Sequence, residues 1–422
     1  MDRPGRLSRR QVMRRIAAGG VALAIVPPHV LGGPEKTPPS NVLTHGTIGC
    51  GGMGVAGHIV ANAEGRPPVQ LAVCDVHKGR LAAGMAKAAR SCTAYTDWRH
   101  VIDRRDIDII HVPTPPHWHA LITLAAVQAG KDVFCEKPFT RTIDEGQKLV
   151  EAVERHGRIV HVNVHGRSAH NGDWLLRLVE LNLLGWPLTV RVDTVGMITA
   201  APNPPVRPAP PDFDYDMWLG PAPWRPFCGV ERYNFRAYWD YDSGAMGDFG
   251  QHHFDPVQMA LGKDGEFPIE VEASAPPQDP FVVGRWHWIR VRYADGTMVL
   301  FDGEQPCPGL DRNVIAQGPK GRFYKDQGVL KSDPPGLAER LRAMGRQRKW
   351  LTFDEAVRTR NFASGAKPNA AAAHHSCTVV NMGTIAVRVG RTLRFDAGTQ
   401  RFINDDAANA LAQQPMRAPW RM

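Results

Sequence analysis

A lysine at the end of an apolar strand is the residue of this chain best placed to do chemistry. Lys137 belongs to the tripeptide Glu136-Lys137-Pro138 and follows the apolar run 132–135. Upstream, the run Gly49-Cys50-Gly51-Gly52-Met53-Gly54 has the G-x-G-x-x-G spacing that seats a dinucleotide pyrophosphate on a helix N-terminus. Parallel sheets bind ligands at the carboxyl ends of their strands, so Glu136 and Lys137 are expected to face the same crevice. Together the two motifs indicate hydride chemistry beside a nicotinamide ring.

The glycines of this fingerprint supply three different properties. Gly49 allows a tight turn, Gly51 lets the backbone approach a phosphate, and Gly54 lets a helix pack closely on the preceding strand. Gly52 and Met53 complete the same loop. Because the run follows an apolar strand and is expected to open a helix, we interpret all five residues as cofactor-binding.

An acidic residue bears on the choice of cofactor. Asp75 ends the predicted strand 69–75, where a carboxylate suits the free ribose hydroxyls of NAD and repels the 2′-phosphate of NADP. Lys78 and Arg80 lie nearby in the sequence. NAD is therefore the expected cofactor, and NADP stays possible.

A second loop is expected to face the same cofactor. Thr114 and His117 lie between a predicted strand, 107–112, and a predicted helix, 120–129, and we interpret both as cofactor contacts. His117 and His119 form an H-x-H pair, but no further ligands with the spacing of a metal site accompany them. We therefore predict no metal site.

The third motif lies far along the chain. Asp248, His252 and Asp255 share one face of a predicted helix, at positions i, i+4 and i+7. In one interpretation, Asp248 orients the imidazole of His252, which accepts a proton near neutral pH. In the other, Asp248 caps the helix, Asp255 caps a second helix begun by Pro256, and the histidines are polar surface. The residues alone leave both interpretations open.

Four residues are candidates for substrate binding. The segment 212–241 is dense in aromatic residues, which could stack on sugar rings or stabilise loops. Trp239 is the residue of this segment that we expect to contact the substrate. Arg167 follows the last predicted strand of the first domain and could reach the same cleft, and His253 and Asp255 accompany His252.

The elements that position these residues fall into two groups. Up to about residue 165, strands alternate with helices, which predicts a parallel sheet with crossover helices. Thr142 to Glu145 is a capping box that opens a helix ending at Gly157. Later, the run 286–302 predicts a hairpin and 370–389 a helix. We predict a Rossmann NAD(P)-binding domain over 45–165. An α+β domain with an open, mostly antiparallel sheet follows over 166–422, and its C-terminal helix and tail could pack back on the first domain.

The N-terminus resembles an export signal. Ser8 to Met13 (SRRQVM) matches a twin-arginine motif, and the mildly apolar stretch 16–26 that follows is too short to span a bilayer. We predict an export segment over 1–33 and a linker over 34–44, with the cleavage point open and a disordered basic arm as the alternative. No later run is long enough to be transmembrane, so we predict no stable membrane span.

The charge distribution and the cysteine spacing argue against a nucleic-acid-binding protein and against a disulfide-stabilised scaffold. Residues 1–33 hold six arginines and one aspartate, so +5 of the formal +9 charge lies there and +4 remains. The other basic residues are interspersed with acidic ones, which predicts no nucleic-acid binding. The seven cysteines show no C-x-x-C spacing, which argues against a disulfide scaffold.

From about Thr44 onward, the chain resembles the glucose–fructose oxidoreductase, inositol dehydrogenase and MocA family, exported twin-arginine type. The shared features are the glycine fingerprint, the stretch from Thr114 to Glu136-Lys137-Pro138, and the element Asp248-x-Gly250-x-His252-x-x-Asp255. The resemblance implies the two domains described above, homodimers or homotetramers, and a catalytic set of Lys137, Asp248 and His252. It favours the catalytic interpretation of the third motif.

The resemblance also implies a mechanism. His252, held by Asp248, takes the proton of a substrate hydroxyl while a hydride leaves that carbon for the nicotinamide, and Lys137 donates to the same oxygen. The expected activity is an NAD(P)-dependent oxidoreductase that acts on a hydroxyl carbon of a carbohydrate or polyol. Twin-arginine export would place the folded protein in the periplasm, where no nicotinamide pool exists, so the cofactor is expected to be held tightly. The alternative is an NAD-dependent glycosidase that transiently oxidises its substrate, eliminates or hydrolyses, and reduces it again.

Overall fold

The structure, a computed structural model, describes residues 42–59, 69–88, 91–168, 170–192, 195–230, 233–343 and 349–422. The predicted export segment 1–33 and residues 34–41 of the predicted linker lie outside these ranges. Residues 44–422 pack as one unit, which contains every element described below.

The first sheet has six parallel strands in the order β3-β2-β1-β4-β5-β6, which confirms the predicted doubly wound fold. In this order β1 and β4 are neighbours, so the crevice at their carboxyl ends is the expected ligand site. The strands are β1 (Thr44–Ile48), β2 (Val69–Cys74), β3 (Thr93–Tyr95), β4 (Ile109–Val112), β5 (Asp132–Cys135) and β6 (Val160–Val162).

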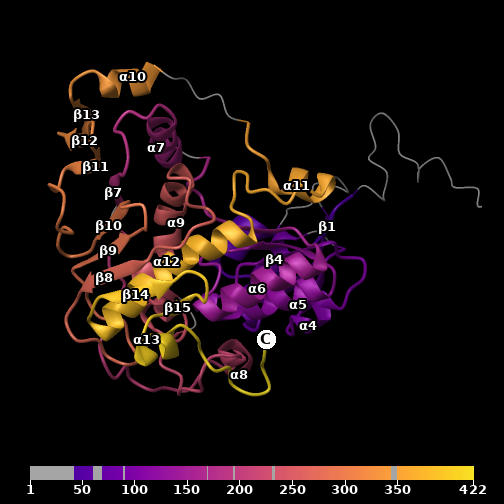
Figure 1. Cartoon of the computed structure of the whole chain (residues 1–422). Coiled ribbons are helices and arrows are strands. Elements are labelled where there is room, and N and C mark those ends of the chain that lie inside the picture. The colour runs from indigo at the N-terminus through magenta and orange to yellow at the C-terminus, as the bar shows by residue number, and fades with distance from the viewer. Residues whose placement is uncertain are drawn as a thin grey trace, which may run out of the picture. The chain divides into compact units, whose positions relative to one another are not determined.

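Helices connect these strands as crossovers (Figure 1). The predicted capping box is confirmed, because the Thr142 side chain accepts from the backbone N–H of Glu145 and the helix ends at Gly157 with φ 57°. The element after the glycine fingerprint is a short π-helix where a regular α-helix was expected. The helices are η2 (Gly54–His58), α3 (Lys78–Lys87), α4 (Arg99–Ile102), η3 (Pro116–Trp118), α5 (His119–Gln128) and α6 (Ile143–His156).

The second sheet has nine strands in the order β13-β12-β11-β7-β10-β9-β8-β14-β15. Only the β7–β10 pair is parallel, so the predicted mostly antiparallel sheet is confirmed, and β9 and β10 form the predicted hairpin. The strands are β7 (Thr189–Val192), β8 (Glu270–Ser274), β9 (Trp288–Arg292), β10 (Met298–Asp302), β11 (Val314–Gly318), β12 (Gly321–Asp326), β13 (Val329–Asp333), β14 (Leu393–Asp396) and β15 (Arg401–Phe402).

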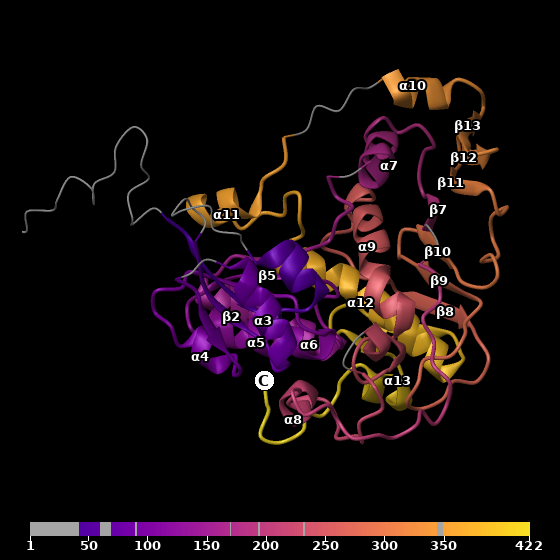
Figure 2. The ribbon, with the colours of Figure 1, turned by 180° about the vertical axis from the view of Figure 1, so that it is seen from behind.

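Helix α12 joins the two sheets into one structure. It packs against α6 of the first sheet and against α9 and β8 of the second, as Figures 1 and 2 show from opposite sides. Its first turns enter the core of the first sheet, and its later turns enter the core of the second. The helices of this part are α7 (His170–Glu180), α8 (Tyr215–Leu219), η4 (Tyr233–Ala237), α9 (Gly244–Ala260), α10 (Leu337–Ala343), α11 (Phe353–Thr359), α12 (Ala370–Val389) and α13 (Asp406–Leu411).

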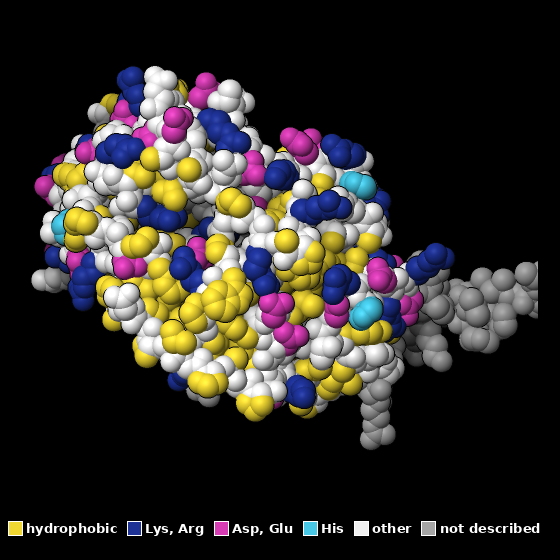
Figure 3. Space-filling view, turned by 90° about the horizontal axis from the view of Figure 1, so that it is seen from below, with side chains coloured by type: hydrophobic (Ala, Val, Ile, Leu, Met, Phe, Trp, Pro, Cys, Tyr) yellow, Lys and Arg dark blue, Asp and Glu magenta, His cyan; other side chains and the backbone are white. Residues whose placement is uncertain are grey.

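The surface carries both charged and apolar side chains. Figure 3 shows hydrophobic side chains grouped between scattered charges on the face seen from below Figure 1. Within the described ranges, the most exposed large hydrophobic residues are Val206 (66%) and Trp224 (64%). No helix in those ranges combines the length and the apolarity that a bilayer crossing requires.

Candidate active site

A cavity of about 680 Å³ lies at the carboxyl ends of β1, β2, β4 and β5. Both halves of the chain contribute to its walls, because η4 and α9 reach it from the second sheet's side. The lining residues are Gly49, Gly51, Gly52, Met53, Asp75, Arg80, Pro113, Thr114, Pro115, Pro116, Glu136, Lys137, Phe235, Arg236 and Asp248. The structure thus brings most of the predicted cofactor residues together with Lys137 and Asp248.

The glycine turn has the geometry that a pyrophosphate requires. Gly49 has φ +112°, and a side chain there would lie 3.0 Å from the backbone of Pro113. At Gly54 a side chain would lie 1.9 Å from the carbonyl oxygen of Gly49, so the turn closes tightly on itself. A side chain at Gly51 would meet nothing within 4 Å, since this glycine faces the open cavity. These residues fit a dinucleotide whose phosphates approach the backbone at Gly51.

Asp75 is fixed by the backbone of the same turn. Its carboxylate accepts hydrogen bonds from Cys50 N (2.7 Å) and His77 N (2.8 Å). Burial raises the pKa of Asp75, and these two amides oppose that rise. A carboxylate has about four acceptor sites, so Asp75 can still accept from ribose hydroxyls while the amides hold it.

Only one of the two cofactor contacts predicted in the loop after β4 lines the cavity. Thr114 lines the cavity, whereas His117 is buried behind the wall and donates from Nε2 to Trp218 O (2.8 Å). The expectation that His117 contacts the cofactor is therefore corrected. His119 lies within hydrogen-bond distance of Pro138 O (2.7 Å) and Thr114 O (2.8 Å), and so ties this loop to the segment after Lys137. No group of metal-ligating side chains occurs in the described ranges.

Lys137 is held by Asp248, which reaches it from α9. The ammonium donates to Asp248 Oδ1 at 2.5 Å, and Arg236 Nε donates to Oδ2 at 2.6 Å. The Lys137 and Asp248 side chains are 9% and 3% exposed. The ring of Phe249 lies 5.0 Å from the ammonium. The expectation that Asp248 orients His252 is wrong, because the Asp248 carboxylate binds Lys137 and Arg236 while His252 Nδ1 contacts the backbone N–H of His165.

His252 follows one turn later on α9 and meets His165. Its Nδ1 accepts from the backbone N–H of His165 at 3.3 Å, and the two rings pack edge to face. Burial, followed by the positive charge of Lys137, lowers the pKa of His252 to about 3. The ring is therefore neutral, and with Nδ1 as acceptor it carries its proton on Nε2. In this state His252 is a hydrogen-bond donor, not the proton acceptor expected from the sequence.

A second cavity, of about 780 Å³, has His165, His252 and His253 in its wall. It lies between α7, α9 and the strands β7, β11 and β13. Apolar side chains such as Trp174, Leu175 and Val190 make up much of the rest of its lining. His253 is thus placed beside His252 in a space large enough for a substrate.

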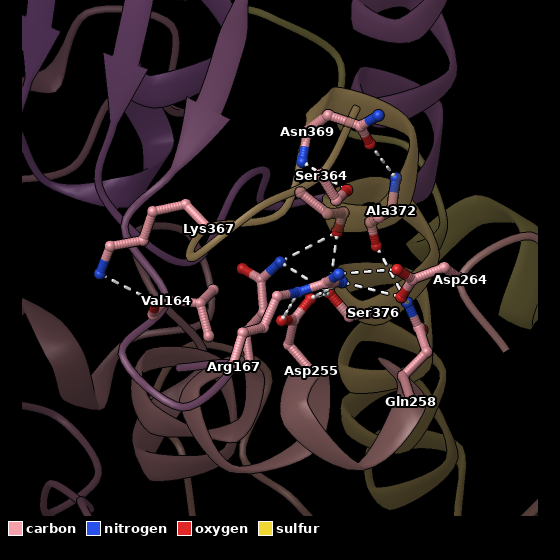
Figure 4. A network of polar contacts seen from close by, with 12 residues as sticks. Val164, Arg167, Asp255, Gln258, Asp264, Ser364, Lys367, Asn369, Ala372 and Ser376 are labelled. Carbon is pink, nitrogen blue, oxygen red and sulfur yellow. Dashed lines mark hydrogen bonds and ion pairs between the residues drawn. The ribbon is translucent and has the colours of Figure 1, made fainter. Parts of the chain in front are cut away.

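Arg167 and Asp255 form a buried ion-pair network (Figure 4), and neither residue lines either cavity. Arg167 Nε donates to Asp255 Oδ1 at 2.6 Å and Nη1 donates to Asp264 Oδ2 at 2.6 Å. Ser376 of α12 donates to the other oxygen of Asp255 at 2.9 Å. The expectation that these two residues bind substrate is corrected, because Arg167 pairs with Asp255 and Asp264, and Asp255 joins α9 to α12 through Ser376. The helix also continues through Pro256, so Asp255 caps no second helix.

Trp239 is likewise part of the core. It is 2% exposed, its Nε1 donates to Asp279 O at 2.9 Å, and Arg388 lies 5.0 Å from its ring. The expectation of a substrate contact is corrected in favour of packing. The same aromatic-rich segment does supply the site with Phe235 and Arg236, which the sequence analysis missed. The sequence could not show that Arg236 belongs to the site, because an arginine near aromatic residues has many possible partners.

Two family models cover almost all of the described chain. The model "Oxidoreductase family, NAD-binding Rossmann fold" matches residues 43–164, and "Oxidoreductase family, C-terminal alpha/beta domain" matches residues 171–422. Both describe the glucose–fructose oxidoreductase, inositol dehydrogenase and MocA family.

Individual relatives are more distant. A levoglucosan dehydrogenase of Pseudarthrobacter phenanthrenivorans is 28% identical over 52% of this chain and 52% of its own length. An inositol 2-dehydrogenase of Salmonella typhimurium is 31% identical over 35% of this chain and 44% of its own length. The chain thus spans about half the length, or less, of these curated relatives. The WlbA dehydrogenase from Bordetella pertussis, solved in complex with NADH and UDP-GlcNAcA, superposes with a TM-score of 0.57 at 17% identity, over 84% of this chain and 99% of that one.

The superposition supports the fold, and the two family models, which match both halves of the chain, identify the family. The chain belongs to the Gfo/Idh/MocA oxidoreductase family and has its NAD-binding Rossmann domain.

Proposed function

We propose that the protein is an NAD-dependent oxidoreductase that acts on a hydroxyl-bearing carbon of a sugar or polyol. One observation carries the proposal: the ammonium of Lys137 lies in the same cavity as the glycine turn, held there by a buried carboxylate. The relatives described above include dehydrogenases of levoglucosan and inositol, which are compounds of this class.

Lys137 serves as the donor to the reacting oxygen. Asp248 fixes its ammonium group, so little reorganisation is needed when negative charge develops on that oxygen. NAD, when bound by the glycine turn and Asp75, supplies the hydride acceptor. In the reducing direction Lys137 gives a proton to the oxygen, and in the oxidising direction it takes the proton back.

His252 completes the binding of the same oxygen. Its neutral ring presents Nε2–H, which can donate a second hydrogen bond to the substrate. Because His252 and His253 line the second cavity, we place the body of the substrate there and its reacting carbon between His252 and Lys137.

We also propose that the cofactor stays bound through turnover and that the protein is exported. The twin-arginine pattern of residues 8–13 supports export, and an exported enzyme has no pool of nicotinamide to exchange with. Desalting of the purified protein tests this: stoichiometric NAD(H) should remain, and an empty, freely exchanging site would argue for an ordinary dehydrogenase. Fractionation of cells expressing the wild type and an Arg9→Lys/Arg10→Lys variant tests the route.

Turnover with defined substrates tests the activity. Purified protein is supplied with inositols, anhydrosugars and aldoses, and nicotinamide absorbance and sugar products are measured together. Formation of ketone or lactone with matching cofactor reduction supports the proposal. Release of aglycone from aryl glycosides without net NADH would instead favour the NAD-dependent glycosidase.

Assembly is the remaining part of the proposal. We expect a homodimer or homotetramer, because apolar side chains gather on the face seen in Figure 3 and such patches often mark protein contacts. Light scattering coupled to size exclusion measures the mass directly.

A further inference from the structure

Three buried histidines form a hydrogen-bonded row behind Lys137. His58 Nε2 lies 2.8 Å from Glu136 Oε1, and His58 Nδ1 lies 3.2 Å from His111 Nδ1. His111 Nε2 then lies 2.8 Å from His45 Nδ1. His58, His111 and His45 are 1%, 8% and 3% exposed, so the row runs through the interior.

Each inner member of the row has one ring nitrogen for each neighbour. A neutral imidazole has one donor and one acceptor nitrogen, so it can receive a proton on one side and release another from the other side. His58 and His111 are placed in this way between Glu136 and His45. The arrangement is a line and not a cluster converging on one point, and no metal-holding group occurs in the described ranges.

The two ends of the row differ in their surroundings. At one end, the carboxylate of Glu136 lines the cofactor cavity next to Lys137. Although burial opposes it, hydrogen bonds from His58 and Asn163 lower the pKa of Glu136 to about 2. At the other end, burial lowers the pKa of His45 to about 4, and the exposed carboxylates of Asp354 and Asp108 oppose that fall. The row thus runs from the cavity toward these two acidic residues, and its outermost nitrogen, His45 Nε2, is buried and makes no hydrogen bond among the described residues.

Packing alone does not account for this row. Strands buried in a parallel sheet are normally continuous apolar runs, and burying polar rings in them costs free energy unless they are hydrogen-bonded. His45 and His111 sit in adjacent strands β1 and β4, and His58 comes from the turn of η2. An apolar residue at each of these positions would pack without that cost.

The proposed reaction moves one proton for each hydride. Reduction of a ketone by NADH consumes one proton from the medium, and oxidation of the alcohol releases one. When cofactor and substrate fill the two cavities, Lys137 needs a route to exchange its proton that does not pass the ligands. Glu136 precedes Lys137 in the chain and lines the same cavity, and its carboxylate is the end of the histidine row nearest to that cavity.

We propose that Glu136, His58, His111 and His45 form a proton path between the active site and the surface beneath α11. The proposal rests on the proposed function, because it assigns the proton of that reaction to these residues. In the reducing direction a proton enters at His45, each imidazole passes one on from its other nitrogen, and Glu136 delivers one to neutral Lys137. No electrons move along the path, and in oxidation each transfer is reversed.

Single-turnover kinetics test the path. His111→Gln and His45→Gln keep polar side chains but cannot relay protons, and His161→Gln is the matched control. His161 is equally buried on β6, beside Phe353, and it makes no hydrogen bond to Glu136, His58, His111 or His45. With a pH indicator, we expect proton release in the two path variants to lag behind first-turnover NADH formation by about tenfold or more, and kcat to fall with it. The control should match the wild type.

A second measurement needs no turnover. In NAD-saturated protein labelled with [15N]histidine, the exchange of the ring N–H of His111 and His58 with water is followed by NMR. His45→Gln should slow this exchange about tenfold or more and His161→Gln should not. Unchanged exchange in His45→Gln, or unchanged proton release in His111→Gln, overturns the path. Slowed exchange in a protein that oxidises no polyol keeps the path and rejects the proposed function instead.

Discussion

Replacing Lys137 by methionine separates the chemical role of its ammonium from its structural role. The ammonium makes one ion pair, with Asp248 at 2.5 Å, and packs near Phe249. Methionine keeps the length and the apolar packing of the side chain but removes the charge and the donor. The nucleotide turn is not touched by this change, so NAD(H) should stay bound.

The expected magnitudes follow from these contacts. Loss of a preorganised donor to a developing oxyanion lowers kcat by about 10²–10³, or about 2.7–4 kcal/mol. Removing one partner of a buried ion pair costs about 3–5 kcal/mol of stability when the other charge is left alone. Asp248 keeps Arg236 at 2.6 Å, so we expect Lys137→Met to cost less than that, about 1–3 kcal/mol.

The matched control is Arg236→Met. It removes the other cation from the same carboxylate and leaves the Lys137–Asp248 pair intact. Both variants should therefore lose similar stability in urea titrations, while only Lys137→Met loses kcat by two orders of magnitude or more. Arg236→Met alters the cavity wall, so we expect a change in KM, but it should keep kcat within about tenfold of the wild type.

Two results would refute this reasoning. If both variants lose kcat equally, the integrity of the ion-pair network matters and the ammonium does not act on the substrate. If Lys137→Met retains kcat within about tenfold of the wild type, the donor lies elsewhere.

Three further changes have defined outcomes. Asp75→Ser removes a carboxylate that repels a 2′-phosphate, a contact costing several kcal/mol, and should raise kcat/KM for NADP relative to NAD by at least about tenfold in steady-state assays. Arg167→Met leaves Asp255 and Asp264 without their shared cation and should cost about 3–5 kcal/mol in urea unfolding; a loss under about 1 kcal/mol would contradict the buried network. Burial lowers the pKa of five histidines to about 3 or 4, so the unfolded chain binds protons that the folded chain does not as pH falls below about 6.5. Stability should therefore be full above about pH 6.5 and fall steadily toward about pH 4, as urea midpoints across this range would show. These histidines are His45, His117, His161, His252 and His374.

The sequence predicts the fold well because its elements are locally determined. The capping box at Thr142, the glycine at 157 and the hairpin around Asp295-Gly296 each depend on neighbouring residues, and all three are confirmed. The glycine fingerprint also depends on local backbone geometry, so Gly49, Gly51 and Gly54 take the predicted places.

The site could be predicted only in part because its partners come from distant segments. Helical spacing correctly placed Asp248 and His252 on one helix, but it could not show that Lys137 and Arg236 reach the carboxylate first. Arg167 and Asp255 are charged residues near the motif, and the sequence cannot distinguish a buried ion pair from a ligand contact.

One residue of the histidine row could have been recognised from the sequence alone. His111 interrupts the apolar run of β4, whose neighbours Ile109, Ile110 and Val112 are all fully buried. A polar residue at such a position needs a partner, which points to a network within the sheet. The partners themselves, on β1 and η2, follow only from the strand order.

Helix α12 limits how this protein can admit a ligand. The same rigid rod is embedded in the hydrophobic interiors of both sheets and is bonded to α9 through Ser376 and Asp255. A hinge motion that opens the two halves widely would have to remove α12 from the hydrophobic core of one of the two sheets. We therefore expect a dinucleotide to enter and leave through movements of surface loops while the two halves stay joined by α12.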